Sequence, residues 1–112
     1  MPQFLAEVYR EQYAIAECPS EHCKSTVLAA QTANELLDIN GIKASFVLTV
    51  YNGRIFLSAR SIDEVNVQII AEKLGGGGHI NSAGAQFEHT NVKEAIEALK
   101  VTIDQMIEEG DI

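Results

Sequence analysis

Hydrophobic and polar positions alternate most regularly in two segments that flank Asn52-Gly53, the strongest short-range signal for a β-hairpin. Residues Ser45–Tyr51 and Arg54–Arg60 therefore form two antiparallel strands, and a two-residue turn sets their register. Six residues then share one apolar face, in the cross-strand pairs Val50 with Ile55, Leu48 with Leu57 and Phe46 with Ala59. The opposite face carries Thr49 with Phe56, Val47 with Ser58 and Ser45 with Arg60. This register places Ser58 and Arg60 on one side of the same strand.

Two other segments show the three-to-four spacing of apolar residues that is typical of amphipathic helices. The first helix is expected from Ser25 to Ile39, and Asn40-Gly41 supplies its stop. Its predicted stripe consists of Val27, Ala30, Asn34, Leu36 and Leu37. The last helix starts at a cap and capping box formed by Asn91 and Glu94. Its predicted stripe consists of Val92, Ile96, Leu99, Ile103 and Met106.

Between the hairpin and the last helix, the pattern predicts one helix, a glycine loop and a strand. Ser61 and Glu64 have the spacing of a capping box for a helix that continues to Leu74. Four glycines from Gly75 end this helix, and Ala83–Phe87 re-enters the sheet as a strand. With a first strand over Gln12–Glu17, the expected order is β-α-β-β-α-(Gly loop)-β-α. The fold class is therefore a small mixed α/β sheet with about three helices.

Composition limits the function classes. The 112 residues suit one domain, and 16 acidic against 8 basic residues give a formal charge of −8. This charge excludes duplex nucleic acid as an expected partner, since a polyanion would be repelled. Two cysteines and three histidines are too few for a disulfide scaffold and favour a reduced, intracellular context. No segment has the length and hydrophobicity of a membrane span or the pattern of a signal peptide.

The glycine run that ends in His79 carries the strongest chemical signal. Glycines let backbone N–H groups approach an anion closely, and His79 adds a directed donor. The segment Leu74–Phe87 also contains no Asp, Glu, Lys or Arg. The standard phosphate fingerprints are absent, because no Gly-Lys-Ser/Thr follows the glycines and the loop comes after a helix rather than a strand. Phosphate binding and a plain flexible turn both remain open on residue chemistry alone.

Four further groups of residues are candidates for sites. Arg60 has two interpretations, a surface ion pair with Asp63 or Glu64 and a phosphate clamp assisted by the Ser58 hydroxyl. Asn81 fits a turn residue better than a ligand-binding one. A metal site is not expected from the irregular set of Cys18, His22 and Cys23, and neither cysteine has the surroundings of an activated nucleophile. His89, beside Glu88, is expected in the loop before the last helix.

The segment Phe56–Gln86 resembles the DHH-associated C-terminal domain of DHH-type phosphoesterases. The GGGGH-type loop of that family matches Gly75–His79, followed by Ser82-Ala83-Gly84. Ser58–Ser61 and Glu64–Val67 are similar to the bacterial cyclic-di-AMP phosphodiesterase branch. The specific part of the resemblance covers about Ser58–Ala85, and the order of elements extends it over nearly the whole chain.

This resemblance implies that residues 1–112 form a single substrate-binding domain, the C-terminal part of a longer chain. The catalytic manganese would sit in a separate N-terminal DHH domain, so this chain should have no catalytic residue, no metal ligand and no hydrolytic activity by itself. Asn66 falls at a family-like position near the start of a helix. The implied ligand is cyclic-di-AMP, its linear product or a related short dinucleotide. The expected substrate-binding residues are Ser58, Arg60, Asn66, Gly75, Gly76, Gly77, Gly78, His79 and Asn81.

The resemblance leaves several alternatives open. The parent could instead be an oligoribonuclease or adenosine-bisphosphate phosphatase of the same superfamily. A different class is a non-catalytic nucleotide-binding or dimerisation module, since related domains occur in alanyl-tRNA synthetases, although the acidic charge weakens the tRNA-linked version. The resemblance also implies a homodimer as one assembly. It further implies a parent that acts on the cytoplasmic side, in some members from a membrane anchor.

Overall fold

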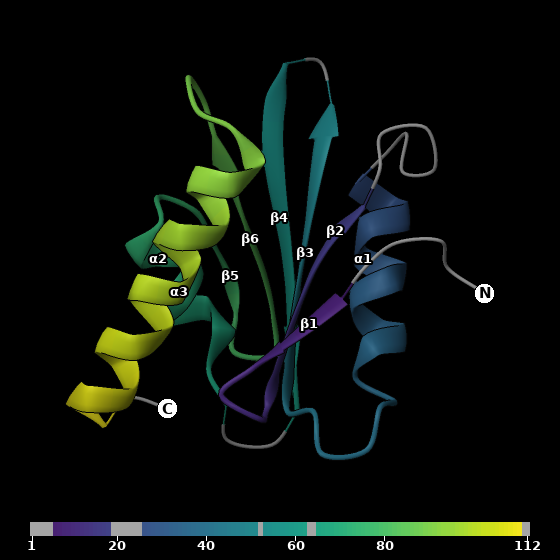
Figure 1. The fold of residues 1–112 in the computed structure, drawn as a ribbon, viewed down its shortest axis with the longest axis vertical. Helices are drawn as coiled ribbons and strands as arrows, with labels where there is room; N and C mark the ends of the chain where they lie inside the picture. Colours follow the sequence, from purple (N-terminus) through teal and green to yellow (C-terminus); the bar gives the residue numbers. More distant parts are fainter. Residues whose placement is uncertain (1–5, 19–25, 52, 63–64, 111–112) are drawn as a thin grey trace.

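A six-stranded sheet with helices on both faces forms the body of the chain, of which the computed structural model describes residues 6–18, 26–51, 53–62 and 65–110 (Figure 1). The strands are β1 (Ala6–Tyr9), β2 (Tyr13–Cys18), β3 (Ala44–Tyr51), β4 (Arg54–Ser61), β5 (Gly77–His79) and β6 (Ser82–Phe87). The helices are α1 (Thr26–Leu36), α2 (Val67–Lys73) and α3 (Val92–Glu109). The sheet order is β1-β2-β3-β4-β6-β5, and β2–β3 is its parallel pair. The expected mixed α/β class with three helices is confirmed.

The central hairpin has the register predicted from the sequence. Val50 lies opposite Ile55, Leu48 opposite Leu57 and Ser45 opposite Arg60. Gly53 takes a φ of +76°, which suits the tight turn after residue 52. Five of the six residues expected on the apolar face are buried, whereas Val50 is 36% exposed.

The larger part of the core lies between the sheet and the pair α2–α3. Inward-facing residues of β2, β3, β4 and β6 meet the apolar sides of both helices there. The fully buried side chains at its centre are Phe46, Leu48, Ile70, Leu99, Ile103 and Met106. α3 begins as predicted, since the Asn91 side chain accepts a hydrogen bond from the Glu94 N–H at 2.9 Å. The Glu94 carboxylate accepts from the Thr90 hydroxyl at 2.7 Å.

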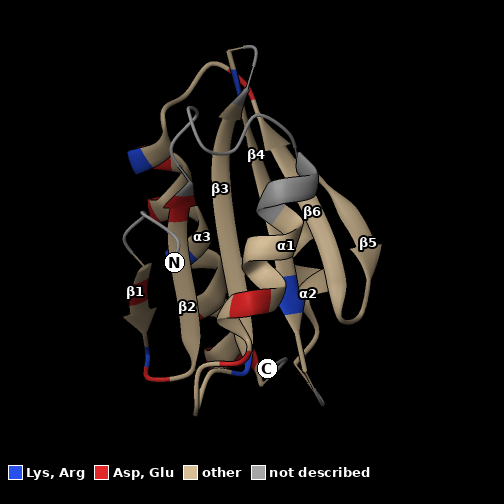
Figure 2. Cartoon of the chain, turned by 90° about the vertical axis from the view of Figure 1, so that its right-hand side faces the viewer, with Lys and Arg blue, Asp and Glu red and all other residues tan. Residues whose placement is uncertain are grey.

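The other face of the sheet is only partly covered, by α1. A smaller cluster joins α1 to β2 and β3 through Ala33, Leu36, Ala14 and Val47. The Ser45 hydroxyl donates to the Ala33 carbonyl and fixes the helix over β3. In Figure 2, α1 lies in front of β3 and β4, while β6 and β5 extend beside it with no helix drawn over them. The fold therefore leaves one corner of this face open.

Both the first and second helices differ from the prediction in detail. α1 ends at Leu36 rather than Ile39, and Asn34 is exposed instead of lying in the apolar stripe. The N-cap of α2 is Asn66, whose side chain accepts from the Ile69 N–H at 3.3 Å. The expected capping box was wrong, because Ser61 is the last residue of β4 and pairs with Ala44. Glu64 lies outside the described residues.

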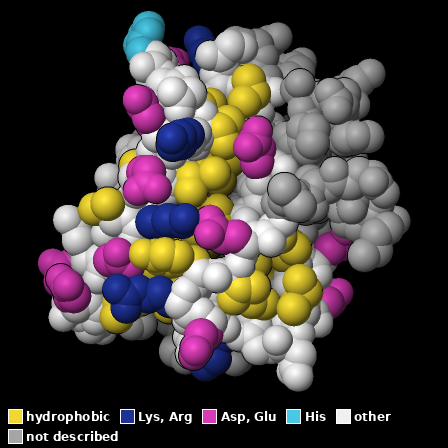
Figure 3. All heavy atoms as spheres, viewed as in Figure 1, with side chains coloured by type: hydrophobic (Ala, Val, Ile, Leu, Met, Phe, Trp, Pro, Cys, Tyr) yellow, Lys and Arg dark blue, Asp and Glu magenta, His cyan; other side chains and the backbone are white. Residues whose placement is uncertain are grey.

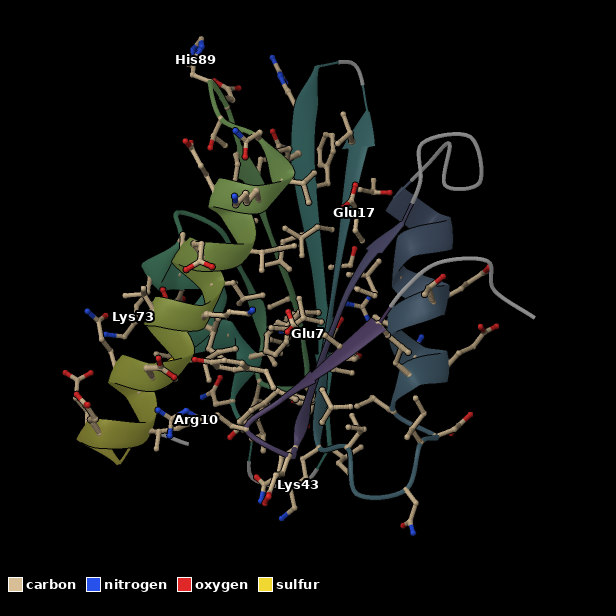
Figure 4. The ribbon with its side chains drawn as sticks, viewed as in Figure 1. Glu7, Arg10, Glu17, Lys43, Lys73 and His89 are labelled. Carbon is tan, nitrogen blue, oxygen red and sulfur yellow. The ribbon has the colours of Figure 1, made fainter. Side chains whose placement is uncertain are left out.

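Strand β1 was not expected from the sequence. It pairs antiparallel with β2 at one edge of the sheet, and polar contacts hold it against α3. The Tyr9 hydroxyl donates to Asp104 at 2.8 Å, and Lys100 pairs with Glu7 at 2.8 Å. The hydrogen bond to Asp104 is the main cause of the raised pKa of Tyr9. Figure 4 shows Glu7 on β1 and Arg10 just beyond it, close to α3.

Candidate phosphate-binding site

A pocket of about 720 Å³ occupies the open corner of the sheet beside α1. Its size falls in the range of small-molecule sites. Strands β4, β5 and β6 form it, together with the glycine segment before β5 and Ala30 of α1. The lining residues beyond Ala30 are Phe56, Leu57, Ser58, Arg60, Gly75, Gly76, Gly77, Gly78, Ser82, Ala83, Gly84, Ala85 and Gln86.

Strand pairing arranges the pocket floor in three rows. The first row is Phe56 opposite Gln86. In the middle row, Ser58 lies opposite Gly84, which in turn lies opposite Gly77. In the last row, Arg60 lies opposite Ser82, which lies opposite His79. Because directly paired residues project to the same face of a sheet, these side chains share the side that α1 leaves uncovered.

The first two glycines end α2. Gly75 takes a φ of +92°, and its N–H donates to the Glu72 carbonyl at 3.1 Å. The Gly76 N–H donates to the Ala71 carbonyl at 2.7 Å. These two bonds form a Schellman motif, in which the residues after the helix satisfy its last carbonyls. The N–H groups of both glycines are therefore engaged within the protein.

The next glycines form a strand, not the loop that the sequence predicted. Gly77, Gly78 and His79 pair with β6 as the edge strand β5. A Cβ on Gly76 would lie 2.7 Å from the Ala85 Cα, and one on Gly78 would lie 2.5 Å from the Ala83 Cα. At Gly77, a Cβ would meet nothing within 4 Å, and its φ is not positive. Helix capping and strand packing thus account for three of the four glycines, while the fold places no such demand on Gly77.

Arg60 and Ser58 project into the same pocket. The Nη1 group of Arg60 donates to the carbonyl of Ala59 at 2.7 Å, which leaves other N–H groups of the guanidinium for a ligand. No carboxylate among the described residues forms an ion pair with Arg60, and Asp63 and Glu64 lie outside them. The Ser58 hydroxyl likewise makes no hydrogen bond to a described residue. The geometry therefore permits the phosphate-clamp interpretation of both residues.

The pocket differs in charge from the rest of the surface. Among the described residues that line it, Arg60 is the only charged one. Over α3, by contrast, basic and acidic side chains alternate among exposed hydrophobic ones (Figure 3). Lys73 pairs with Glu109 at 3.7 Å there, and Arg10 pairs with Asp104 at 2.8 Å. A single cation with no carboxylate among the described lining residues favours a small anionic ligand even in an acidic protein.

Asn66 and Asn81, both expected to bind substrate, lie outside the pocket lining. Asn66 caps α2. The Asn81 side chain donates to the Ser61 hydroxyl at 2.9 Å, and that hydroxyl donates to the Val65 carbonyl at 2.6 Å. These bonds give both asparagines a structural role, and the geometry lends no support to a binding role.

His79 is exposed and does not line the pocket, although its row contains Arg60 and Ser82. His89 lies at the tip of the segment between β6 and α3, with a φ of +58° (Figure 4). Phe56, Ser82, Gly84 and Gln86 line the pocket but were not expected there from the sequence. Their alternation along β4 and β6 would have placed them there if the pairing of these strands had been known.

Metal ligands do not gather in the described part of the chain, where no three His, Cys, Asp or Glu residues could hold an ion together. His22 and Cys23, which are near Cys18 in the sequence, lie outside that part. Among the helices of the structure, none is both long and apolar enough to cross a membrane.

The family of the chain follows from its similarity to known proteins. The DHHA1 domain matches residues 11–109. The chain belongs to the DHHA1 family. Similar curated proteins include the "cyclic-di-AMP phosphodiesterase PdeA" of Listeria monocytogenes, 41% identical over 99 residues and 88% of this chain. The "cyclic-di-AMP phosphodiesterase GdpP" of Bacillus subtilis is 42% identical over 106 residues and 92% of this chain. This DHHA1 chain spans only 15 to 16% of the length of these two relatives.

Solved structures share the DHHA1 fold at lower identity. An exopolyphosphatase-related protein from Bacteroides fragilis has a TM-score of 0.79 at 22% identity, over 90% of this chain and 31% of that one. The C-Ala domain of alanyl-tRNA synthetase from Aquifex aeolicus has a TM-score of 0.63 at 18% identity, over 88% of this chain and 96% of that domain. At these identities, the likeness establishes the fold.

Proposed function

We propose that this DHHA1 chain is the substrate-binding domain of a manganese-dependent phosphodiesterase that hydrolyses cyclic-di-AMP or a related short dinucleotide. The observation that carries the proposal is the pocket in which Arg60, Ser58 and Gly77 meet, with no acidic residue among the described lining residues. A guanidinium can hold phosphate oxygens through two parallel N–H bonds. The Ser58 hydroxyl adds a short-range donor, and Gly77 lets the ligand approach the backbone.

The names of the relatives favour the cyclic-di-AMP branch over the oligoribonuclease alternative. Two proteins named as cyclic-di-AMP phosphodiesterases match 88 and 92% of this chain at more than 40% identity. The chain covers a small share of their length, so the remaining chemistry of such a parent would belong to other domains. The role that we assign to this chain is to bind and orient the phosphodiester.

Manganese does not fit the described residues, since they contain no cluster of three potential ligands. We therefore assign the metal to a separate DHH domain of the parent. We expect this chain alone to release no product from cyclic-di-AMP in the presence of manganese, as measured by chromatography. Turnover that survives repurification would show that catalytic ligands lie within these 112 residues.

Titration with the linear dinucleotide pApA, followed through backbone amide signals, tests the binding role. We expect shifts in the three rows of the pocket and an affinity loss of roughly tenfold or more for Arg60→Gln, because a hydrogen bond to a charged group is removed. Arg54→Gln is the matched control, since Arg54 lies on the same strand outside the pocket and pairs with Glu88 at 3.4 Å. Equal losses in both variants, or shifts on the α3 side, would refute the assignment.

A further inference from the structure

We propose that the pocket has a separate base-recognition subsite, formed by Phe56 and Gln86, that prefers adenine. The inference rests on the proposed function, because it takes Arg60 as the group that holds the phosphate. Phe56 and Gln86 lie directly opposite each other on β4 and β6, and both line the pocket. They make the row farthest from Arg60 and Ser82.

The spacing of the rows suits one nucleotide. Phe56 and Arg60 are four residues apart on one strand, which at about 3.4 Å per residue separates their Cα atoms by about 14 Å. The long Arg60 side chain reaches back over part of this distance, so the gap matches an extended nucleotide. Between the two ends lies the row of Ser58, Gly84 and Gly77, whose small side chains leave room for a sugar.

Phe56 supplies a surface for stacking. Phe56 is half-buried, and the other residues of the three rows are serines, glycines, one glutamine, one arginine and the exposed His79. Nucleobases stack on aromatic side chains regardless of base identity. Phe56 therefore contributes affinity for a base without selecting which base is bound.

Gln86 supplies the selection. It is exposed, and its side-chain amide makes no hydrogen bond to another described residue, so both its donor and its acceptor remain available. A glutamine amide can pair with the N6 amino group and N7 of adenine at once, whereas guanine presents two acceptors on that edge. The position beside Phe56 puts this amide at the edge of a stacked base.

Three probes separate the contributions: AMP, GMP and ribose 5-phosphate, each titrated into this chain and followed by amide shifts. We expect AMP to bind more tightly than GMP, and ribose 5-phosphate to bind most weakly. Phe56→Leu should lower the affinity for AMP roughly 2- to 12-fold and leave the affinity for ribose 5-phosphate unchanged, because only stacking is lost. Phe87→Leu is the matched control, since Phe87 is the next residue to Gln86 but packs against the core on the other face.

Gln86→Leu should bring the affinities for AMP and GMP to within about twofold of each other, because the paired donor and acceptor are gone. Gln12→Leu, at an exposed glutamine before β2, should leave the preference intact. If AMP and ribose 5-phosphate bind equally while Arg60→Gln weakens both, the base subsite is refuted and the phosphate site stands. If none of the probes depends on Arg60, the proposed function fails as well.

Discussion

Replacing Gly77 by alanine separates the ligand-binding role of the glycine run from its structural role. The added methyl would meet no protein atom within 4 Å, and the backbone there has no positive φ. It would project into the middle row of the pocket, beside Gly84 and Ser58. The matched control is Gly78→Ala, where the new Cβ would lie 2.6 Å from the Ser82 carbonyl oxygen and φ is +148°.

These geometries predict opposite effects on stability. Gly77→Ala should leave the free energy of unfolding unchanged or raise it by about 0.4–1 kcal/mol, because alanine restricts the unfolded chain. Gly78→Ala should lower it by about 2–4 kcal/mol, since overpacking and an unfavourable φ add together. At roughly 4 °C per kcal/mol for a domain of this size, the control should lose about 8–16 °C in Tm.

The affinity for the ligand, by contrast, should fall when Gly77 is replaced. Thermal unfolding gives the two Tm values, and titration with pApA gives the affinity of the folded protein. Gly77→Ala should bind about tenfold more weakly, because the added methyl keeps the ligand from approaching the backbone at this position. Full affinity in Gly77→Ala would refute the close approach at this residue. A Gly78→Ala variant as stable as the unmodified protein would refute the packing account of β5.

Three further predictions concern residues outside the pocket. Asn66→Ala should lower the free energy of unfolding by about 1 kcal/mol through loss of the α2 cap, in urea denaturation, while the affinity for pApA stays within twofold. Asn81→Ala should lower the free energy of unfolding by at least about 1 kcal/mol in the same assay, because the buried Ser61 hydroxyl loses a hydrogen-bond donor. The affinity for pApA should again stay unchanged. Tyr9 should ionise above the usual tyrosine pKa, since its hydroxyl donates to Asp104, and Asp104→Asn should lower that pKa in a titration followed by tyrosinate absorbance. The raised pKa means that this contact stabilises the fold below the ordinary tyrosine pKa and is lost as the pH rises through the folded value.

The hairpin was predictable from sequence because its turn and its alternation agree. Asn52-Gly53 and the two apolar rows allow one register, and that register carried Ser58 and Arg60 to the correct face. The helix after it was misplaced at its start. The spacing of Ser61 and Glu64 fits a capping box, but pairing with Ala44 keeps Ser61 in β4. The N-cap of α2 is therefore Asn66.

The rest of the site depends on contacts that no local pattern encodes. Glycine disfavours strands, so nothing in Gly77 or Gly78 indicates that they pair with β6. β1 is only four residues long and largely exposed, and it is held by contacts with Asp104 and Lys100, more than ninety residues along the chain. Gln86 lies in the site because β6 pairs with β4, and the sequence did not determine this strand order.

The Schellman motif gives the pocket a thermodynamic link to the opposite side of the sheet. Gly76 closes α2 and Gly77 begins β5, so no residue between them can absorb a displacement. A ligand that fixes Gly77 must therefore also stabilise the last turn of α2 against fraying. By reciprocity, fraying of this turn must lower the affinity for the ligand. Hydrogen exchange at Leu74, Gly75 and Gly76 and occupancy of the pocket then report on one equilibrium.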